Sequence, residues 1–229
     1  TLYIAAAIEM LSGILVFFIS RKFSQEVTSA EETNIALSKT TMLVLCAFGF
    51  AGFASLSLEA SWTRVLTMIL GSSTYAFSII LTTFLFGIAL GSFIISKFVD
   101  RIKNPFAWFA AIEVMIGVTV VFLTPVLGYL PRLFLNIFKI TGGSFWSMHL
   151  MQILLAGLVM IPPTLLMGAA FPLVVKICSR EFKRMGSSAG NVYFANTVGA
   201  VFGPLAAGFI FIPLFGLQAS IIIAASIYL

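Results

Sequence analysis

The feature that most constrains this chain is an uncharged run of 24 residues from Ser72 to Ile95. An α-helix rises about 1.5 Å per residue and a bilayer core is about 30 Å thick, so about 20 apolar residues are enough to cross it. The run is followed by a short cluster of charged side chains, which are Lys97, Asp100, Arg101 and Lys103. The sequence therefore predicts a transmembrane helix over 72–96 that ends at a charged surface loop.

Composition extends this prediction to the whole chain. Hydrophobic residues make up 60% of the sequence and charged residues 9%, whereas soluble domains carry about 25% charged residues. We therefore expect an all-α polytopic membrane protein whose main partner is the lipid bilayer. The formal charge of +5 does not indicate nucleic-acid binding, because basic loop residues in membrane proteins usually set topology. Cys46 and Cys178 define no metal or redox motif, so no metal and no cofactor are expected in this chain.

Seven apolar runs divide the chain into membrane segments. The runs are 1–20, 40–58, 72–96, 105–124, 147–172, 189–212 and 217–229. The first and last runs are similar, because Ile4, Ala5, Ala6 and Ile8 match Ile223, Ala224, Ala225 and Ile227. We interpret 1–20 as the last helix of a preceding membrane repeat, 21–39 as a cytoplasmic linker and 40–229 as a six-span repeat. A signal peptide is the competing interpretation of 1–20, although no basic segment precedes it.

Short internal sequence similarities favour a repeated structural unit. The segment 110–117 repeats the Ala-Ala-Ile-Glu and glycine pattern of 6–13. Two Gly-xxx-Gly pairs, each preceded by Gly-Ser-Ser, are predicted to be helix-packing seams, because small residues let helices approach closely in lipid; these glycines are Gly87, Gly91, Gly199 and Gly203. A three-helix unit repeated within six spans is typical of several transporter folds, and chance similarity between Ala/Gly-rich helices is the alternative.

Basic residues predict the sidedness of the spans. The loops 21–39, 96–104 and 173–188 contain ten of the thirteen Lys and Arg residues. The positive-inside bias places these loops in the cytoplasm of a bacterial inner-membrane protein. Arg132 and Lys139 fall on the other side, within 128–140, which reads as a short amphipathic helix at the outer interface. Pro162 and Pro163 predict a kinked or broken helix over 147–172.

Three acidic residues are candidates for a solute or proton site. Glu9, Glu59 and Glu113 are predicted to lie nearest membrane depth, where ionisable groups usually face a cavity or a partner. Glu113 is the strongest candidate, since it lies well inside its predicted span. The alternative for all three is a helix-end position or an interhelical hydrogen bond. Trp62, close to Glu59, is expected to anchor the helix at the interface.

Polar residues of the span 189–212 form a second candidate group. Asn191, Tyr193 and Asn196 could bind a polar solute or bond to a neighbouring helix. His149 is expected to be an interface residue. The motifs of soluble enzymes, such as a P-loop, HExxH or GxSxG, do not occur, so no catalytic residue is predicted.

Several segments carry a family resemblance. The loop around Asp100 and Arg101 resembles the short loop motif of the major facilitator superfamily, although Ser96 replaces its glycine and Lys103-Asn104 replaces its later glycine and basic pair. Three longer segments are more specific: LEASWTRVLTMILGSSTYAFS (58–78), PPTLLMGAAFP (162–172) and GNVYFANTVGAVFGPLAAGFIFIPLFGL (190–217). Together they resemble the membrane region of bacterial fused major-facilitator/spermidine-synthase-like proteins.

This resemblance implies a six-helix major-facilitator-like repeat with one helix of a preceding repeat. It also implies a cytoplasmic aminopropyltransferase-like domain, with a Rossmann-like fold and decarboxylated S-adenosylmethionine as substrate, beyond residue 229. No catalytic residue of such a domain lies in this chain. The leading hypothesis is a membrane module that anchors this enzyme and passes a polyamine or related cation.

Other functions stay open. The rival hypothesis is a structural subunit of a larger membrane complex, without transport or catalysis. Expected partners are other helices of the same longer polypeptide or of such a complex, and the chain could also form a homo-oligomer.

Overall fold

The computed structural model describes residues 10, 14, 38–141, 144–182 and 185–229, and for residues 141 and 180–188 it describes no side chains. The chain divides into two compact units, Thr1–Ala36 and Leu37–Leu229. The predicted helix 1–20, with Glu9, and nearly all of the linker 21–39 lie outside the described residues. The fold is therefore that of the second unit.

Long helices make up the second unit. They are α2 (Lys39–Leu70), α3 (Thr74–Ser96), α4 (Pro105–Thr141), α5 (Phe145–Phe182), α6 (Met185–Ala206) and α7 (Ile212–Ser226), with short turns η2 (Val99–Arg101) and η3 (Ala207–Phe211). The described residues contain no β-strand, and five of their helical segments are long and apolar enough to cross a membrane. This confirms the predicted all-helical membrane class.

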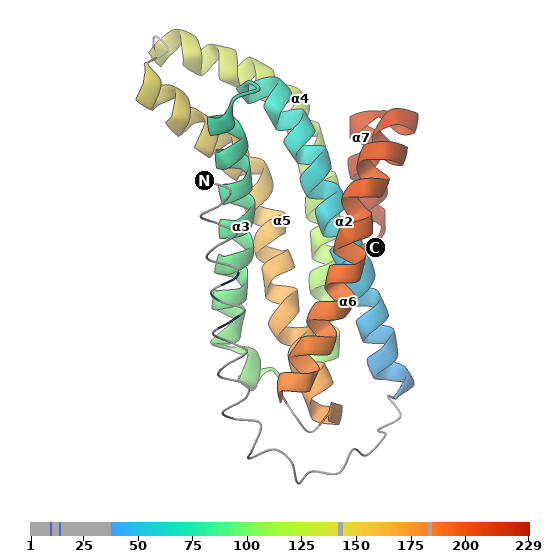
Figure 1. Ribbon diagram of the computed structural model, residues 1–229. Helices are drawn as coiled ribbons and strands as arrows, with labels where there is room; N and C mark the ends of the chain where they lie inside the picture. Colours follow the sequence, from blue (N-terminus) through green and yellow to red (C-terminus); the bar gives the residue numbers. More distant parts are fainter. Residues whose placement is uncertain (1–9, 11–13, 15–37, 142–143, 183–184) are drawn as a thin grey trace. The chain divides into compact units, whose positions relative to one another are not determined.

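Local sequence explains the sharp turn between α2 and α3. Gly71 ends α2 at a φ of 101°, a conformation that glycine adopts without a steric cost. Ser73 then begins α3, since its hydroxyl accepts a hydrogen bond from the Ala76 backbone N–H at 3.1 Å. The two helices are thus joined by only three residues and run in opposite directions (Figure 1).

Successive helices alternate in direction through the unit. The turn after α3 and the connection after α5 lie at one end, and the turn after α2 and the connection after α4 lie at the other (Figure 1). The Lys176 ammonium of α5 donates to the backbone oxygens of Val99, Asp100 and Ile102, which fixes the turn after α3. Most described basic residues lie at the end of the bundle that contains the turn after α3, as the sequence predicted. The compartment that this end faces stays a prediction.

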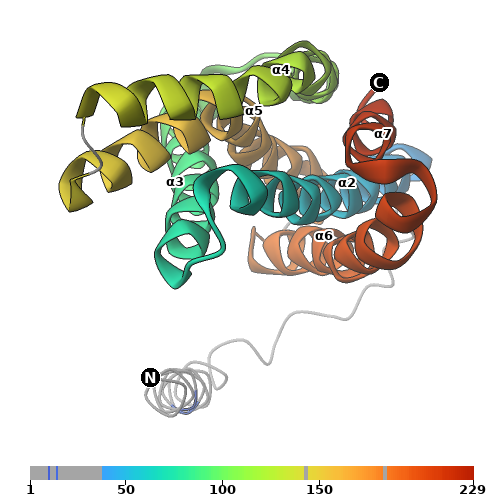
Figure 2. The same cartoon turned by 90° about the horizontal axis from the view of Figure 1, so that it is seen from above.

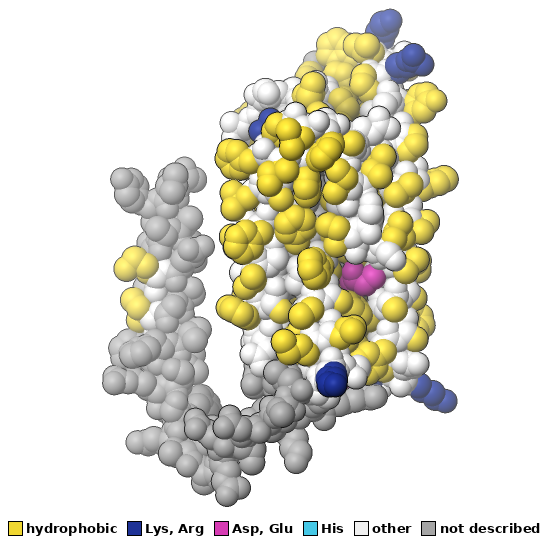
Figure 3. Space-filling view, turned by 90° about the vertical axis from the view of Figure 1, so that its right-hand side faces the viewer, with side chains coloured by type: hydrophobic (Ala, Val, Ile, Leu, Met, Phe, Trp, Pro, Cys, Tyr) yellow, Lys and Arg dark blue, Asp and Glu magenta, His cyan; other side chains and the backbone are white. Residues whose placement is uncertain are grey.

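The surface between the two ends is apolar. Figure 3 shows hydrophobic side chains covering most of the face formed by α2, α4, α6 and α7, with one acidic side chain among them and Lys and Arg side chains near the ends of the helices. Large side chains such as Met68, Phe122 and Phe209 are each 78% exposed. An exposed apolar belt of this kind is expected where lipid, rather than water, surrounds the helices.

The first tight helix pair is α3 with α5. A Cβ added at Gly91 would lie 1.8 Å from the Leu165 carbonyl oxygen, and one at Gly87 would lie 1.9 Å from the Thr164 hydroxyl oxygen. From the other helix, a Cβ at Gly168 would lie 2.0 Å from the Ile88 carbonyl oxygen. The backbones therefore touch along a seam that only glycine permits.

The second tight pair is α2 with α6. A Cβ at Gly199 would lie 1.8 Å from the Gly49 carbonyl oxygen, and one at Gly203 would lie 2.2 Å from the Phe53 carbonyl oxygen. The buried Ser57 hydroxyl donates across this seam to the Gly203 carbonyl oxygen at 2.9 Å. Seen from above, α4 and α7 complete the bundle beside these two pairs (Figure 2).

Several predicted boundaries are wrong. The segment predicted to end at residue 58 continues to Leu70, and Trp62 is 1% exposed in the core instead of anchoring an interface. Packing against neighbouring helices buries the indole, which the sequence alone could not show. The predicted interfacial segment 128–140 is not a separate helix, because it continues α4. The helix α4 includes Pro125, and its last part bends away from the direction of its first part (Figure 1).

The proline-rich helix is also continuous. The helix α5 runs through Pro162, Pro163 and Pro172 and leans over at its beginning without being broken (Figure 1). Pro125 and Pro131 are accommodated in the same way within α4. The prolines therefore shape these helices without dividing them into separate spans.

The last predicted boundary corresponds to a reversal of the chain. Gly216 has a φ of 81°, and both Gly203 before it and Tyr228 after it contact the segment 51–57 of α2. The chain therefore turns back at Gly216, as the separate runs 189–212 and 217–229 predicted. The returning segment is short, so the described residues contain five long apolar segments where the sequence predicted six full spans after residue 39. The predicted major-facilitator-like repeat stays a prediction.

Candidate functional site

A cavity of about 330 Å³ lies between the two tight helix pairs and α4. Its walls are mainly apolar, with Phe48 and Ala51 from α2, Ile116 from α4, and Met167 and Phe171 from α5. Polar side chains reach it from several helices; these are Ser55, Ser92, Glu113, Tyr193, Asn196 and Tyr228. Among the residues that the structure describes, no Lys, Arg or His lines it. The fold thus brings together three residues predicted from sequence: Glu113, Tyr193 and Asn196.

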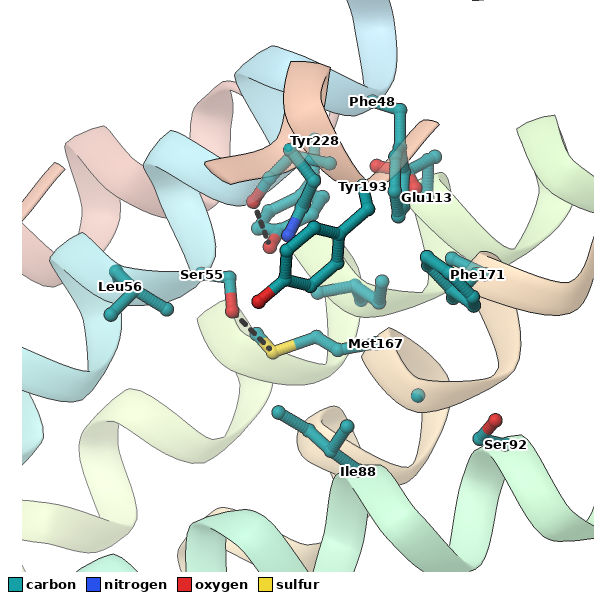
Figure 4. Close-up of a pocket in the computed structure, with 15 residues that line it drawn as sticks. Phe48, Ser55, Leu56, Ile88, Ser92, Glu113, Met167, Phe171, Tyr193 and Tyr228 are labelled. Carbon is teal, nitrogen blue, oxygen red and sulfur yellow. Dashed lines mark hydrogen bonds between the residues drawn. The ribbon is translucent and has the colours of Figure 1, made fainter. Parts of the chain in front are cut away.

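Glu113 supplies the only carboxyl group that the described residues contribute to the cavity. It lies in the first half of α4, on the side of that helix that faces Phe48 (Figure 4). Its Oε1 atom is buried and has no hydrogen-bond partner among the described residues. A carboxyl oxygen buried without a donor is costly, so hydrogen bonding between helices does not explain this position.

Tyr228 closes the cavity from the segment that follows α7. Its hydroxyl donates to the Ala51 backbone oxygen at 2.9 Å, across the interface with α2. The reversal at Gly216 makes this contact possible, because it brings Tyr228 back to the level of Ala51. Glu113 and Tyr228 line the same cavity.

Tyr193 and Asn196 face the cavity from α6. They are three residues apart, a spacing that places side chains on one face of a helix. The Tyr193 ring lies across the cavity and its hydroxyl points toward Ser55 and Met167 (Figure 4), while 65% of the side chain remains exposed. Asn196 lies against Gly52, where a Cβ would come 2.6 Å from the Asn196 Oδ1 atom.

The hydroxyl of Ser55 has a weak partner within the cavity. It donates to the Met167 sulfur at 3.5 Å, which is a poor acceptor (Figure 4). Ser55 and Phe48 are seven residues apart on α2 and therefore share a face. This helical spacing could have indicated from the sequence that both residues face the same side. No sequence pattern indicated that Tyr228 and Glu113 line one cavity.

The remaining predicted site residues lie elsewhere. Asn191 lines a separate surface groove with Phe194, because it is two positions from Tyr193 and projects from a different face of α6. Glu59 does not line the cavity. Asp100 and Arg101 are exposed in η2 at the end of the bundle.

The donor set of the cavity restricts its chemistry. The described residues contain no group of three or more His, Cys, Asp or Glu side chains that could hold a metal ion. A single carboxyl group among aromatic rings favours one organic cation over an anion. The carboxylate supplies a negative charge, and the rings present their negative faces. No described residue of the cavity forms a nucleophile and base pair of the kind that covalent catalysis requires.

The fold and this cavity define a multi-pass helical membrane protein with a carboxylate in its interior. No family model matches the chain, and no solved structure matches it. The chain is 27% identical over 188 residues to polyamine aminopropyltransferase 2 of Aquifex aeolicus (strain VF5). The match covers 82% of this chain and 34% of that protein, so the chain spans about a third of the length of the curated relative.

Proposed function

We propose that the chain is the membrane-embedded module of a polyamine aminopropyltransferase-like protein. It anchors a cytoplasmic enzyme domain to the bacterial inner membrane, with the loops 96–104 and 173–188 on the cytoplasmic side. The module also passes a polyamine or a related cation between the enzyme and the membrane.

The distant similarity to polyamine aminopropyltransferase 2 carries this proposal. A match over 82% of the chain necessarily includes most of its helical residues, so the similarity involves the membrane segments themselves. The relative is much longer than the matched segment, which leaves room for a separate enzyme domain. The basic end of the bundle suits a cytoplasmic domain, because positive loops favour that side.

The cavity supports the transport part of the proposal. Its carboxyl group, Glu113, is partly buried among helices whose outer surface is mostly apolar. Ionisable residues at such depth usually mark a path for a substrate or an ion. The open side of the cavity at Tyr193 would give a cation access to this carboxylate.

Fractionation and activity measurements test the anchor. The full-length gene product that contains these residues is expressed in bacteria, and aminopropyl transfer to putrescine is assayed in membrane and soluble fractions. We expect the activity to sediment with the membranes, and a matched protein without residues 1–229 to release it into the soluble fraction. Activity that is soluble in both proteins, or absent from both, would contradict the proposal.

Uptake of labelled putrescine into proteoliposomes tests the transport. We expect saturable uptake by the full-length protein and its loss in the Glu113→Gln variant. The Glu59→Gln variant is the control, because it removes a membrane carboxylate that does not line the cavity.

A scaffold subunit without transport or catalysis is the alternative function. The low content of charged residues, 9% of the chain, favours it, since coupled transporters often carry more intramembrane charge. Membrane association with no uptake and no transferase activity in the full-length protein would support this alternative.

A further inference from the structure

We infer that the cavity binds one alkylammonium group, with Glu113 as its counter-ion and aromatic rings as its walls. This inference deepens the proposed function, on which it depends only for the choice of amines to test. The ligand class is a linear primary amine whose charged end lies at Glu113 and whose methylene chain lies along the apolar wall.

First, the Glu113 carboxyl group has neither a basic neighbour nor a hydrogen-bond donor among the described residues of the cavity. Of the described residues that line the cavity, Glu113 is the only acidic one and none is basic. Its Oε1 atom is buried and accepts no hydrogen bond among the described residues. An ammonium group carries one positive charge and three N–H donors, so it satisfies both requirements.

The second step is the aromatic surround. The Phe48 ring lies beside Glu113, and its centroid is 6.1 Å from that of Phe171 (Figure 4). Tyr193 and Tyr228 add two further rings to the same cavity. The faces of aromatic rings attract organic cations, most strongly where water is excluded. A carboxylate among such rings selects for a cation and against an anion.

The third step is the shape of the cavity beyond the carboxylate. Ile88, Ile116 and Met167 provide an apolar wall for a methylene chain. The Tyr193 hydroxyl and the Asn196 side chain, both from α6, offer further acceptors in the lining. The volume of about 330 Å³ falls at the lower end of the range of about 300–1,000 Å³ found for small-molecule pockets. A small linear amine therefore suits the cavity better than a bulky one.

A metal ion is a poorer occupant. Calcium takes about six to eight oxygen ligands, and magnesium requires near-octahedral oxygen coordination. The cavity offers one carboxylate, and the described residues contain no acidic cluster that could complete such a site. An organic cation needs only the single counter-charge and the surrounding rings.

Calorimetry on the full chain in lipid nanodiscs tests the inference. Putrescine and propylamine are the probes, butan-1-ol is the neutral analogue of similar size, and propionate is the anionic one. We expect one saturable site for each amine and no binding of the alcohol or the anion. The Glu113→Gln variant, which retains the shape of the side chain, should weaken amine binding about tenfold or more.

Two further variants distinguish a specific loss of amine binding from a general loss of folding. Glu59→Gln should bind amines like the wild-type chain, since Glu59 does not line the cavity. Phe171→Leu should weaken binding about threefold, because it removes one ring and retains an apolar side chain. Thermal unfolding of each variant establishes that it is folded before binding is compared.

The outcomes that overturn the inference are equally specific. Amine binding that Glu113→Gln leaves unchanged, alcohol binding equal to amine binding, or no amine binding by the folded wild-type chain would each refute it. Membrane-bound transferase activity of the full-length protein is an independent readout. If that activity is present and binding is absent, the inference fails while the anchoring function stands; if both are absent, both fail.

Discussion

Hydroxyl groups of the tight helix pairs and the carboxyl group of the cavity between them differ in their hydrogen bonding. In the pairs, hydroxyl groups donate to nearby carbonyl oxygens: Thr83 to Ile79 at 2.7 Å within α3, and Ser57 to Gly203 at 2.9 Å between α2 and α6. In the cavity, the buried Oε1 atom of Glu113 has no donor among the described residues. Hydrogen bonds between buried groups add to stability, whereas a buried carboxyl oxygen without a donor is a position at which a ligand could donate.

The largest expected effect is on the α3–α5 pair. Gly91→Ala places a Cβ 1.8 Å from the backbone oxygen of Leu165, an atom that cannot move without displacing α5. We expect the free energy of unfolding to fall by about 3 kcal/mol or more, measured by denaturant titration in detergent micelles. Gly128→Ala is the control, because nothing lies within 4 Å of a Cβ added at that glycine of α4. Equal stability of the two variants would mean that the pair is not closely packed.

The next effect concerns the basic end of the bundle. Lys176→Met keeps the length of the side chain but removes the ammonium that donates to the backbone oxygens of residues 99, 100 and 102. Hydrogen bonds from charged groups contribute about 1.5–3 kcal/mol, so we expect a loss of about 2 kcal/mol and faster proteolysis between residues 97 and 104. Lys103→Met, which changes an exposed lysine of the same turn, should have little effect. An unchanged proteolysis rate in Lys176→Met would contradict the role of this lysine.

Removing the carboxyl group of the cavity should raise the free energy of unfolding instead of lowering it. Glu113→Leu removes the buried carboxylate whose Oε1 atom has no donor among the described residues, so we expect the free energy of unfolding to rise by about 1–2 kcal/mol while amine binding is lost. The same change at Glu59, which does not line the cavity, should leave amine binding intact. A marked loss of stability in Glu113→Leu would show that the carboxylate is structural, and the contrast with the helix pairs would disappear.

The smallest effect is expected for a single hydrogen bond between helices. Ser57→Ala removes the donor to the Gly203 carbonyl oxygen across the α2–α6 seam. Such bonds in membrane proteins contribute about 0.6 kcal/mol on average, so the expected loss is of that order. Ser61→Ala is the matched control, because its hydroxyl bonds within α2 to the Ser57 carbonyl oxygen. Similar losses in both variants would show that the seam gains nothing from this bond beyond local helix stability.

The sequence by itself determined the all-helical membrane class and the alternating direction of successive helices. It did so because these depend on local quantities, namely hydropathy and the distribution of charge. It also found Glu113, Tyr193 and Asn196 as polar candidates in apolar surroundings, although it could not separate them from Asn191 and Glu59, which do not line the cavity.

Only the tertiary structure decided which helices pair, that Trp62 is buried, and that the chain returns at Gly216 to place Tyr228 beside Ala51. These features join residues up to 177 positions apart. In lipid every helix is apolar on most of its faces, so hydrophobic periodicity does not reveal which face meets a neighbour. The two Gly-xxx-Gly pairs indicated the packing face of α3 and of α6, but not the partner helix. Contacts between small residues and buried polar groups make that choice, and they exist only once the helices are assembled.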